Sequence, residues 1–599
     1  MKEGKMDRIN NKDVSGKYTV QRLRLFIENE VVTKSPRNVD GVSVPLKEVP
    51  VESEFDYGVN LMPLVKKASL PAEVIGQAIG TAITQGDGSM IEEIALTGPF
   101  LNFKINMPKF AENGLNEIID NGLKFGNENI GRGEIVVIDM SSPNIAKRMS
   151  IGHLRSTIIG DSIASLYRAK GYEVIRDNHI GDWGTQFGKM IYAIKAWGNE
   201  SKLKSSKDPI GDLQNLYVKF HSEAEKDLSL EDQGRSWFLK LEQGDSEAKR
   251  LWKMCVDLSL KEFNEIYDVL NVKFETTLGE SHYESLLKDT MNLVNENPAG
   301  KISDGALVID MEAEGLKSAI VRKSDGASVY FTRDLACAIY REEEMGAGKI
   351  VYVVGEDQRF YFQQLFGALT KLGHSIGQNA VHTPFGMIRM PEGGRMSTRK
   401  GEVILLKDVI EEGFDRVRKV VAKKNEDLTK NIKLTEKEIG QIAIGALKWN
   451  DLSQDAKRSF EFDWDRALKL DGNSGPYVQY TAIRAKSVLN TAKVRPDQLR
   501  IKDLSDMNVF NFPAERALIR QIVELPNVLS DALKSHDPSK VAAFTYEVAK
   551  RFNSFYTKHQ ILKAENDEDK IARLKLVTAT YQVIKNSLAI LGIEVPEQM

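Results

Sequence analysis

The chain has 599 residues, with 82 Lys and Arg against 85 Asp and Glu, and 42% of its residues are hydrophobic. This composition excludes a disordered polymer and a polycation of the histone kind, but a local basic face remains compatible with it. The two cysteines exclude a disulfide framework and a Cys-based zinc site. No apolar run approaches the ~20 residues that span a bilayer, so we expect a cytoplasmic, multidomain protein without membrane contact.

The first 130 residues mix helical and strand patterns. Residues 71–83 carry apolar side chains at helical spacing after an initial proline, which is typical of a helix N-terminus. Residues 100–106 alternate apolar and polar side chains like a half-buried strand. The pattern predicts an α+β N-terminal domain over residues 1–130.

A continuous apolar run at residues 134–139 opens a different pattern, typical of a buried parallel strand. A helical pattern over 151–170 and a second strand at 172–176 follow it, and another strand and helix are predicted at 349–354 and 361–372. Strands that alternate with helices predict a doubly wound parallel sheet of the Rossmann-like α/β class. Ligands of such sheets bind at the carboxyl ends of the strands.

Three domains are predicted from these patterns. The parallel sheet belongs to a domain over 131–435, with a charged and mostly helical insertion at about 199–310. Residues 436–599 show amphipathic helical patterns and little strand signal, which predicts an all-helical C-terminal domain. Its mildly basic character suits an RNA contact but is also common in helical domains generally.

The loop after the first buried strand carries the strongest chemical signal. It reads Ser-Ser-Pro-Asn-Ile-Ala-Lys-Arg-Met-Ser-Ile-Gly-His-Leu-Arg over residues 141–155. Lys147, Arg148 and His153 therefore stand in a strand-to-helix loop, and Gly152 permits close backbone approach. Cations, a glycine and a helix N-terminus together predict a phosphate site.

This string resembles the signature of class I aminoacyl-tRNA synthetases, whose usual form is His-x-Gly-His after the first strand. Its flanks resemble arginyl-tRNA synthetases in particular, and the resemblance covers nearly the whole chain. Residues 98–103 are similar to the additional N-terminal domain with which that family holds the tRNA elbow. Further motifs of the family are matched at 178–188, 330–334, 354–358, 395–401, 475–480 and 591–599.

The resemblance implies the activity of an arginine–tRNA ligase. Such an enzyme activates L-arginine with ATP to arginyl-adenylate and pyrophosphate, then transfers the arginyl group to the 3′-terminal ribose of its cognate tRNA and releases AMP. It also implies that activation needs bound tRNA. We expect ATP with Mg²⁺ as a substrate, no tightly bound cofactor, no metal site in the protein and a monomer.

The resemblance also implies an arginine pocket. A guanidinium needs carboxylate or carbonyl acceptors, and Asp334 would pair with it while Tyr330, four residues earlier on the same helix face, closes the pocket. Asp139 and Asn144 would bind the ammonium end of the substrate, with Gln358 beside them.

On the nucleotide side, the resemblance implies catalytic and ATP-binding residues from two signature loops. The catalytic residues would be Lys147, His153, Arg399 and Lys400. The ATP-binding residues would be Ser150, Gly152, His153, Met387 and Ser397. The terminal Met599 is the candidate tRNA-binding residue, and the aromatic side chains that could stack on unpaired bases are Tyr477, Tyr480, Phe552 and Tyr556.

Four positions depart from the family pattern. Ser150 stands where the first signature histidine is usual, Arg148 replaces a proline, Thr398 replaces a lysine of the second signature loop, and Tyr361 replaces a further histidine. A lysine at position 147 can take over for the lysine absent at 398, because the leaving pyrophosphate needs a nearby cation from either loop.

Two rival functions remain open at this point. A tRNA-binding protein that has lost catalysis would explain Ser150 and Thr398, but it would have no reason to keep an arginine pocket. A class I synthetase for another amino acid is the second rival. Asp334 argues against it, because this carboxylate would repel an anionic amino acid and would stay unpaired beside an apolar one.

Overall fold

The computed structural model describes residues 16–85, 90–389, 404–427, 433–493, 504 and 508–599. The chain forms two compact units. The first comprises Met1–Glu128, Val478–Asp531 and Ala543–Leu588, and the second comprises Asn129–Tyr477, Ala532–Ala542 and Ala589–Met599. Because both units draw on residues 436–599, the boundaries of the three predicted domains stay a prediction.

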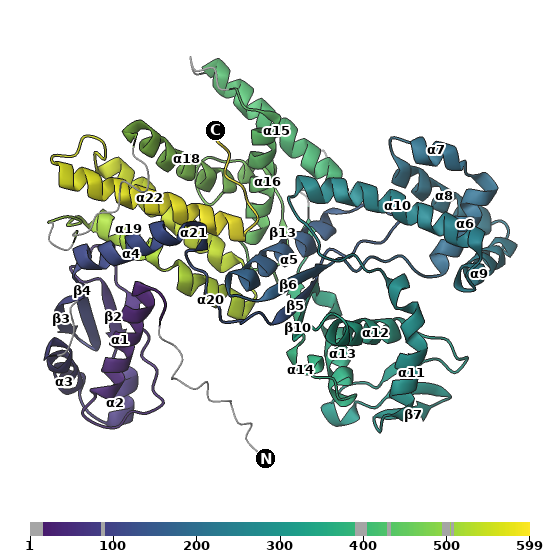
Figure 1. Cartoon of the computed structure of the whole chain (residues 1–599), viewed down its shortest axis with the longest axis horizontal. Coiled ribbons are helices and arrows are strands. Elements are labelled where there is room, and N and C mark those ends of the chain that lie inside the picture. Colours follow the sequence, from purple (N-terminus) through teal and green to yellow (C-terminus); the bar gives the residue numbers. More distant parts are fainter. Residues whose placement is uncertain (1–15, 86–89, 390–403, 428–432, 494–503, 505–507) are drawn as a thin grey trace. The chain divides into compact units, whose positions relative to one another are not determined.

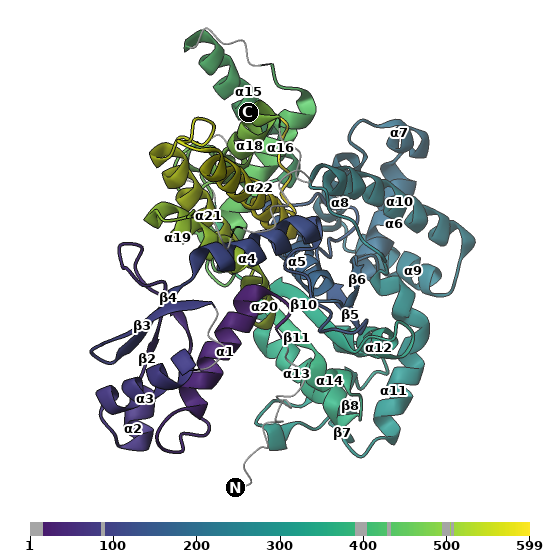
Figure 2. The same cartoon turned by 60° about the vertical axis from the view of Figure 1, so that its left-hand side comes forward.

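The N-terminal part of the first unit is an antiparallel sheet with helices beside it (Figure 2). Leu101, Phe103 and Ile105 alternate inward along one strand and are buried, as the sequence pattern predicts. The helix predicted at residues 71–83 is confirmed, and it corresponds to α3. In strand order the sheet is β1 (Lys47–Glu48), β2 (Tyr57–Asn60), β4 (Phe100–Ile105) and β3 (Ile91–Thr97), and the helices are α1 (Thr19–Thr33), α2 (Met62–Ala68), α3 (Ala72–Gln85) and α4 (Met107–Asn121).

Five long helices near the C-terminus belong largely to the same unit. Their tie to the N-terminal sheet includes a buried ion pair, in which Arg520 Nη1 lies 2.7 Å from Asp56 Oδ1. Such a pair offsets part of the cost of removing both charges from water. The helices are α18 (Gly475–Ala492), α19 (Pro513–Val523), α20 (Leu525–Ser535), α21 (Ser539–Lys558) and α22 (Asp567–Ile590).

The second unit is built on the predicted parallel sheet, with the strand order β11-β10-β5-β6. Val137 and Ile350 of its central strands pack with Leu335 and Leu365 of two covering helices, which places the core beneath the carboxyl ends of the strands. The strands are β5 (Ile135–Asp139), β6 (Glu173–Asp177), β10 (Lys349–Gly355) and β11 (Val381–Phe385), and the helices nearest the site are α5 (Ile151–Ala169), α12 (Tyr330–Glu343) and α13 (Arg359–Lys371).

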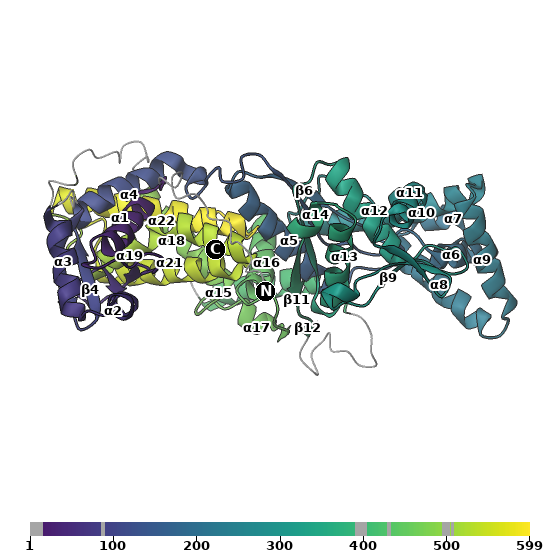
Figure 3. The ribbon, with the colours of Figure 1, turned by 90° about the horizontal axis from the view of Figure 1, so that it is seen from below.

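The predicted insertion is mostly helical, and α6 to α10 gather into one bundle, while α11 lies apart from them beside α12 (Figure 1 and Figure 3). It also contains a small antiparallel sheet that the sequence analysis missed. Asp304 and Gly305, both with positive φ, form the tight Asp-Gly turn between the first two strands. The elements of the insertion are α7 (Glu200–Ser205), α8 (Pro209–Ala224), α9 (Ser229–Glu242), α10 (Ser246–Val269), α11 (Leu287–Glu296), β7 (Gly300–Ser303) and β8 (Ala306–Ile309); α6 (Thr185–Trp197) precedes it and β9 (Ala319–Arg322) follows it.

The end of the second unit is helical apart from one short strand. Two helices, α15 (Leu406–Asp427) and α16 (Glu436–Leu452), are followed by β13 (Phe460–Glu461), which pairs in parallel with β12 (Ile388–Arg389). The segment after residue 436 is therefore not free of strands. Within the described residues, none of the helices has both the length and the apolar composition that crossing a membrane requires.

Candidate functional site

The loop after β5 is joined to the segment that follows β6. The Ile145 N–H donates to the Gly181 carbonyl at 3.1 Å, and the Gly181 N–H donates to the Pro143 carbonyl at 3.1 Å. The Ser142 N–H donates to Asn178 Oδ1 at 3.1 Å. The sequence motifs at 141–155 and 178–188 thus meet at the carboxyl ends of adjacent strands, where this fold class binds its ligands.

Ser150 and His153 form a hydrogen-bonded pair at the start of α5. Ser150 precedes the helix as its N-cap, and its backbone N–H donates to His153 Nδ1 at 3.0 Å. Because Nδ1 accepts this hydrogen bond, it carries no proton of its own, and we assign the proton of the neutral imidazole to Nε2. Burial lowers the pKa of His153, so the ring is a neutral hydrogen-bond donor rather than a cation.

The segment after the second signature loop lies against the first signature. The Ile151 N–H donates to the Ile404 carbonyl at 3.0 Å, and the Leu406 N–H donates to the Met149 carbonyl at 2.9 Å. The predicted loop residues themselves lie outside the described residues, so their roles stay a prediction; they are Ser397, Arg399 and Lys400, with Thr398 among them.

A cavity of about 260 Å³ opens at this junction. Lys147 is exposed there, and its ammonium has no ion-pair or hydrogen-bond partner in the described part of the chain. The neighbouring Arg148 is instead paired with Asp208, the N-cap of α8. Among the described residues, Lys147 is therefore the cation available to a phosphate in this cavity, which is lined by Asn144, Lys147, Arg148, Ser150, His153, Gln214 and Leu405.

Two other predicted nucleotide residues have clear positions. Gly152 is the second residue of α5 and is exposed beside the cavity. Met387 has an exposed side chain, but its N–H donates to Ser459 Oγ at 2.9 Å and its carbonyl accepts the Phe460 N–H at 3.1 Å. Met387 can therefore offer its side chain more readily than its backbone, and its ATP contact stays a prediction.

A buried arginine joins the ends of β5 and β6. Arg341 Nη2 lies 2.7 Å from Asp139 Oδ2 and 2.7 Å from Asp177 Oδ2, and the Arg341 side chain is 0% exposed. The Asp139 carboxylate also accepts a hydrogen bond from Ser142 Oγ at 3.1 Å. Asp139 is thus already bound by a cation of the chain itself, which the sequence analysis did not anticipate.

The sequence contained a signal for both missed residues, Asp177 and Arg341. Asp177 ends the second strand as Asp139 ends the first, and the carboxyl ends of adjacent parallel strands lie at the same edge of the sheet. Arg341 follows Asp334 by seven residues on α12, which places the two on the same helix face.

Asp334 lies half-buried on α12, and the hydroxyl of Tyr361 on α13 donates a hydrogen bond to its Oδ2. Burial raises the pKa of Asp334, and the hydrogen bond from Tyr361 opposes that rise. Tyr330, by contrast, is 66% exposed at the first residue of α12. The structure brings Asp334 together with Tyr361, whereas the predicted roles of Tyr330 and of the exposed Gln358 stay predictions.

Glu280 is a further acidic residue of this region that the sequence analysis missed. Burial raises its pKa to about 7, and the negative charges of Asp334 and Asp182 add to the rise. The positive groups His179 and Arg333 act in the opposite direction. A cation bound among these carboxylates would relieve their mutual repulsion, which suits a site for a positively charged ligand.

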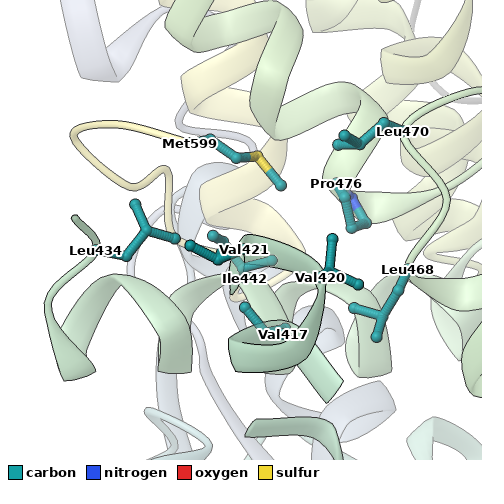
Figure 4. Close-up of a pocket in the computed structure, with 9 residues that line it drawn as sticks. All are labelled: Val417, Val420, Val421, Leu434, Ile442, Leu468, Leu470, Pro476 and Met599. Carbon is teal, nitrogen blue, oxygen red and sulfur yellow. The ribbon is translucent and has the colours of Figure 1, made fainter. Parts of the chain in front are cut away.

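The C-terminal Met599 lies in an apolar pocket with a free volume of about 40 Å³ (Figure 4). Lys448 Nζ donates to the Gly592 carbonyl at 2.7 Å, and Gln598 Nε2 donates to the Lys433 carbonyl at 2.9 Å. The tail is thereby held on α16 within the second unit, while the tRNA contact of Met599 stays a prediction. The pocket is lined by Val417, Val420, Val421, Leu434, Ile442, Leu468, Leu470, Pro476 and Met599.

Comparison with known proteins identifies the family of this site. Residues 115–464 match the family described as tRNA synthetases class I (R), catalytic domain. The chain belongs to the class I arginyl-tRNA synthetase family. Residues 478–599 match the DALR anticodon binding domain.

Curated relatives of this synthetase family resemble the chain over almost their whole length. The arginine–tRNA ligase of Halothermothrix orenii is 39% identical over 92% of this chain and 95% of its own. That of Clostridium perfringens is 40% identical over 92% and 96%, and that of Enterococcus faecalis is 38% identical over 95% and 99%. The resemblance inferred from the motifs is confirmed.

Solved structures of arginyl-tRNA synthetases share the fold. The Thermus thermophilus enzyme has a TM-score of 0.79 at 23% identity, covering 96% of this chain and 100% of its own. The Plasmodium falciparum enzyme has a TM-score of 0.79 at 24% identity, covering 97% and 99%. The predicted α/β class with a helical C-terminal part is therefore confirmed.

Proposed function

We propose that this chain is an active arginine–tRNA ligase, which couples L-arginine to its cognate tRNA with ATP. The observation that carries the proposal is the Asp334 carboxylate, held by Tyr361 beside Glu280 at the carboxyl edge of the parallel sheet. A guanidinium prefers planar carboxylate acceptors in a partly buried site. An inactive tRNA binder has no use for such a pocket.

In the first step, a carboxylate oxygen of arginine attacks the α-phosphorus of magnesium–ATP in line. The bond from the α-phosphorus to the oxygen that bridges the α and β phosphates breaks, so pyrophosphate leaves and arginyl-adenylate remains. Lys147 stabilises the charge of the phosphates, and His153 donates a hydrogen bond to them through Nε2. Arg399 and Lys400 of the second loop complete the site, and catalysis rests on positioning rather than on a general base.

In the second step, the 2′-hydroxyl of the terminal tRNA ribose attacks the carbonyl carbon of the adenylate. The ester bond forms as the hydroxyl loses its proton, and the bond between that carbon and the phosphate oxygen breaks to release AMP. We infer that activation itself waits for tRNA, as in the family, and that the enzyme works as a cytoplasmic monomer.

The tRNA is proposed to contact several parts of the chain. In the helical part of the first unit, the Arg484 guanidinium lies 4.9 Å from the ring centre of Tyr480 and 5.2 Å from that of Tyr556. Such a cation between aromatic rings suits stacking on unpaired anticodon bases. Phe552 is fully buried and packs in the core instead, while Tyr477 is half-buried.

The N-terminal domain offers a separate surface for the tRNA elbow. A groove of about 560 Å³ lies on its sheet. Phe100, 48% exposed, and Asn102 line this groove on β4. An exposed aromatic ring beside an amide is suited to hold an unstacked base.

Arginine-dependent exchange between pyrophosphate and ATP tests the proposal, run with and without cognate tRNA. Exchange that requires arginine, and that appears only with tRNA, supports the substrate, the chemistry and the coupling. Absent exchange in both cases, with tRNA still bound, would point to a tRNA binder that has lost catalysis.

A further inference from the structure

Tyr361 occupies a position where the family pattern has a histidine, yet it contacts the amino-acid side of the site. It stands in the first turn of α13, and its hydroxyl donates to Asp334 Oδ2 on α12. The ring is held in place by two edge-on aromatic contacts. Its centre lies 5.8 Å from that of Phe331 and 5.7 Å from that of Phe362.

The hydrogen bond acts on both the direction and the charge of the carboxylate. A phenol hydroxyl supplies one donor, so it occupies one lone pair of Oδ2 and leaves Oδ1 and the second lone pair of Oδ2 for a ligand. A guanidinium that binds side-on needs donors to meet both carboxylate oxygens in one plane. Fixing one oxygen with a rigid phenol therefore restricts the plane in which the guanidinium can bind.

The charged groups around Asp334 come from several elements. His179, in the segment after β6, favours the ionised carboxylate, and so does Arg341 on α12; Asp139 on β5 disfavours it. Glu280, in the segment before α11, also disfavours it when its own carboxyl is ionised. Burial is the largest influence and raises the pKa of Asp334, while the hydroxyl of Tyr361 lowers it. Removing the hydroxyl would leave a half-buried carboxylate that is less readily ionised.

We propose that Tyr361 is a positioning residue for the guanidinium of the substrate, and that it acts through Asp334 to favour arginine over a neutral ureido isostere. This inference rests on the proposed function. A bound cation gains from an ionised, oriented carboxylate, but a neutral ureido group gains much less. Tyr361 thereby contributes to specificity without touching the reacting atoms.

The test is the variant Tyr361→Phe, which removes the hydroxyl and keeps the ring. Tyr352→Phe is the matched control, because Tyr352 lies on β10 against Phe362 at 4.9 Å and its hydroxyl has no hydrogen-bond partner among the described residues. In tRNA-dependent exchange, we expect Tyr361→Phe to raise the KM for arginine about tenfold. The KM for ATP and kcat should stay within about twofold, and Tyr352→Phe should change neither KM by more than that.

Three further measurements separate positioning from a merely structural role. Citrulline, the ureido isostere, should bind more weakly than arginine to the unmodified enzyme. The ratio of the citrulline Ki to the arginine KM should be smaller in Tyr361→Phe than in the unmodified enzyme. The acid limb of kcat/KM for arginine should move to higher pH in the variant. In a double-mutant cycle, adding Tyr361→Phe to Asp334→Asn should cause no further loss, since Tyr361 acts through Asp334.

An unchanged KM for arginine in Tyr361→Phe, or an equal rise in both Michaelis constants, would overturn the inference. Additive losses in the double mutant would overturn it as well. These outcomes differ from a failure of the proposed function, in which the unmodified protein itself would show no arginine-dependent exchange.

Discussion

Arg155 on α5 and Asp451 on α16 form a buried ion pair within the second unit, with Nε 3.2 and 3.1 Å from the two carboxylate oxygens and Nη2 3.0 Å from one of them. Arg155 Nη1 also donates to the carbonyls of Gly386 and Arg458, at 2.8 and 2.9 Å. One side chain thus ties the signature helix to the strand that leads to Met387. Its guanidinium has a donor for each of these acceptors, which a lysine would lack.

Breaking this pair should destabilise the protein strongly. Arg155→Met leaves the Asp451 carboxylate buried without its partner, and such losses cost about 3–5 kcal/mol in the free energy of unfolding. Urea unfolding followed by circular dichroism measures the change. Lys226→Ala is the control, because its ion pair with Glu223 is exposed and should contribute at most about 1 kcal/mol. Equal effects of the two substitutions would contradict the assigned role of Arg155.

Asp334→Asn should impair the use of arginine while leaving ATP binding nearly intact. The substitution removes the charge that pairs with the guanidinium, so we expect the KM for arginine to rise at least about 30-fold. The KM for ATP should change by no more than about twofold. Pyrophosphate exchange at varied arginine and ATP concentrations gives both constants, with the exposed Asp325→Asn as the control. Unchanged arginine use would remove Asp334 from the pocket.

Lys147→Ala should depress activation far more than it weakens tRNA binding. Loss of the cation nearest the phosphates should lower kcat for exchange by about 10²–10³-fold. Lys147→Arg keeps the charge and should recover part of the rate. Filter binding of tRNA serves as the comparison, and an equal loss of exchange and tRNA binding would point to a structural role instead.

His536 should make the second unit less stable in mild acid. Burial lowers its pKa to about 4, aided by the positive charge of Lys349, and its Nε2 lies 2.7 Å from the Tyr167 hydroxyl. Between pH 6.5 and 4 the unfolded chain binds more protons at this residue than the folded chain does, so stability falls as the pH falls. From pH 7 to 5 the loss should reach about 2 kcal/mol.

Thermal or urea unfolding across this pH range measures the effect. His536→Gln removes the titrating group, so its stability should depend less steeply on pH than that of the unmodified protein. Parallel pH profiles of the two proteins would show that His536 is not buried in its neutral form.

Local pattern in the sequence was enough for much of the fold. The apolar run at 134–139 and the helical pattern at 151–170 correspond to β5 and α5, because period and capping are properties of neighbouring residues. The short strands β7 and β8 were not predicted, because four residues each carry too little periodic signal. The Asp304-Gly305 turn between them is nevertheless typical of a hairpin.

The signature string together with its flanks and the further motifs predicted the family, and the string predicted the edge of the sheet where the site lies. Only the tertiary structure decided the partners of the site residues: Arg341 for Asp139, Tyr361 for Asp334, and Asp451 for Arg155. Each of these contacts joins residues at least 27 positions apart. Spacing along the chain predicts which residues share one face of a helix or strand. A long-range pair forms only when packing brings two such faces together. A buried charge is then stabilised by the partner that this packing places beside it.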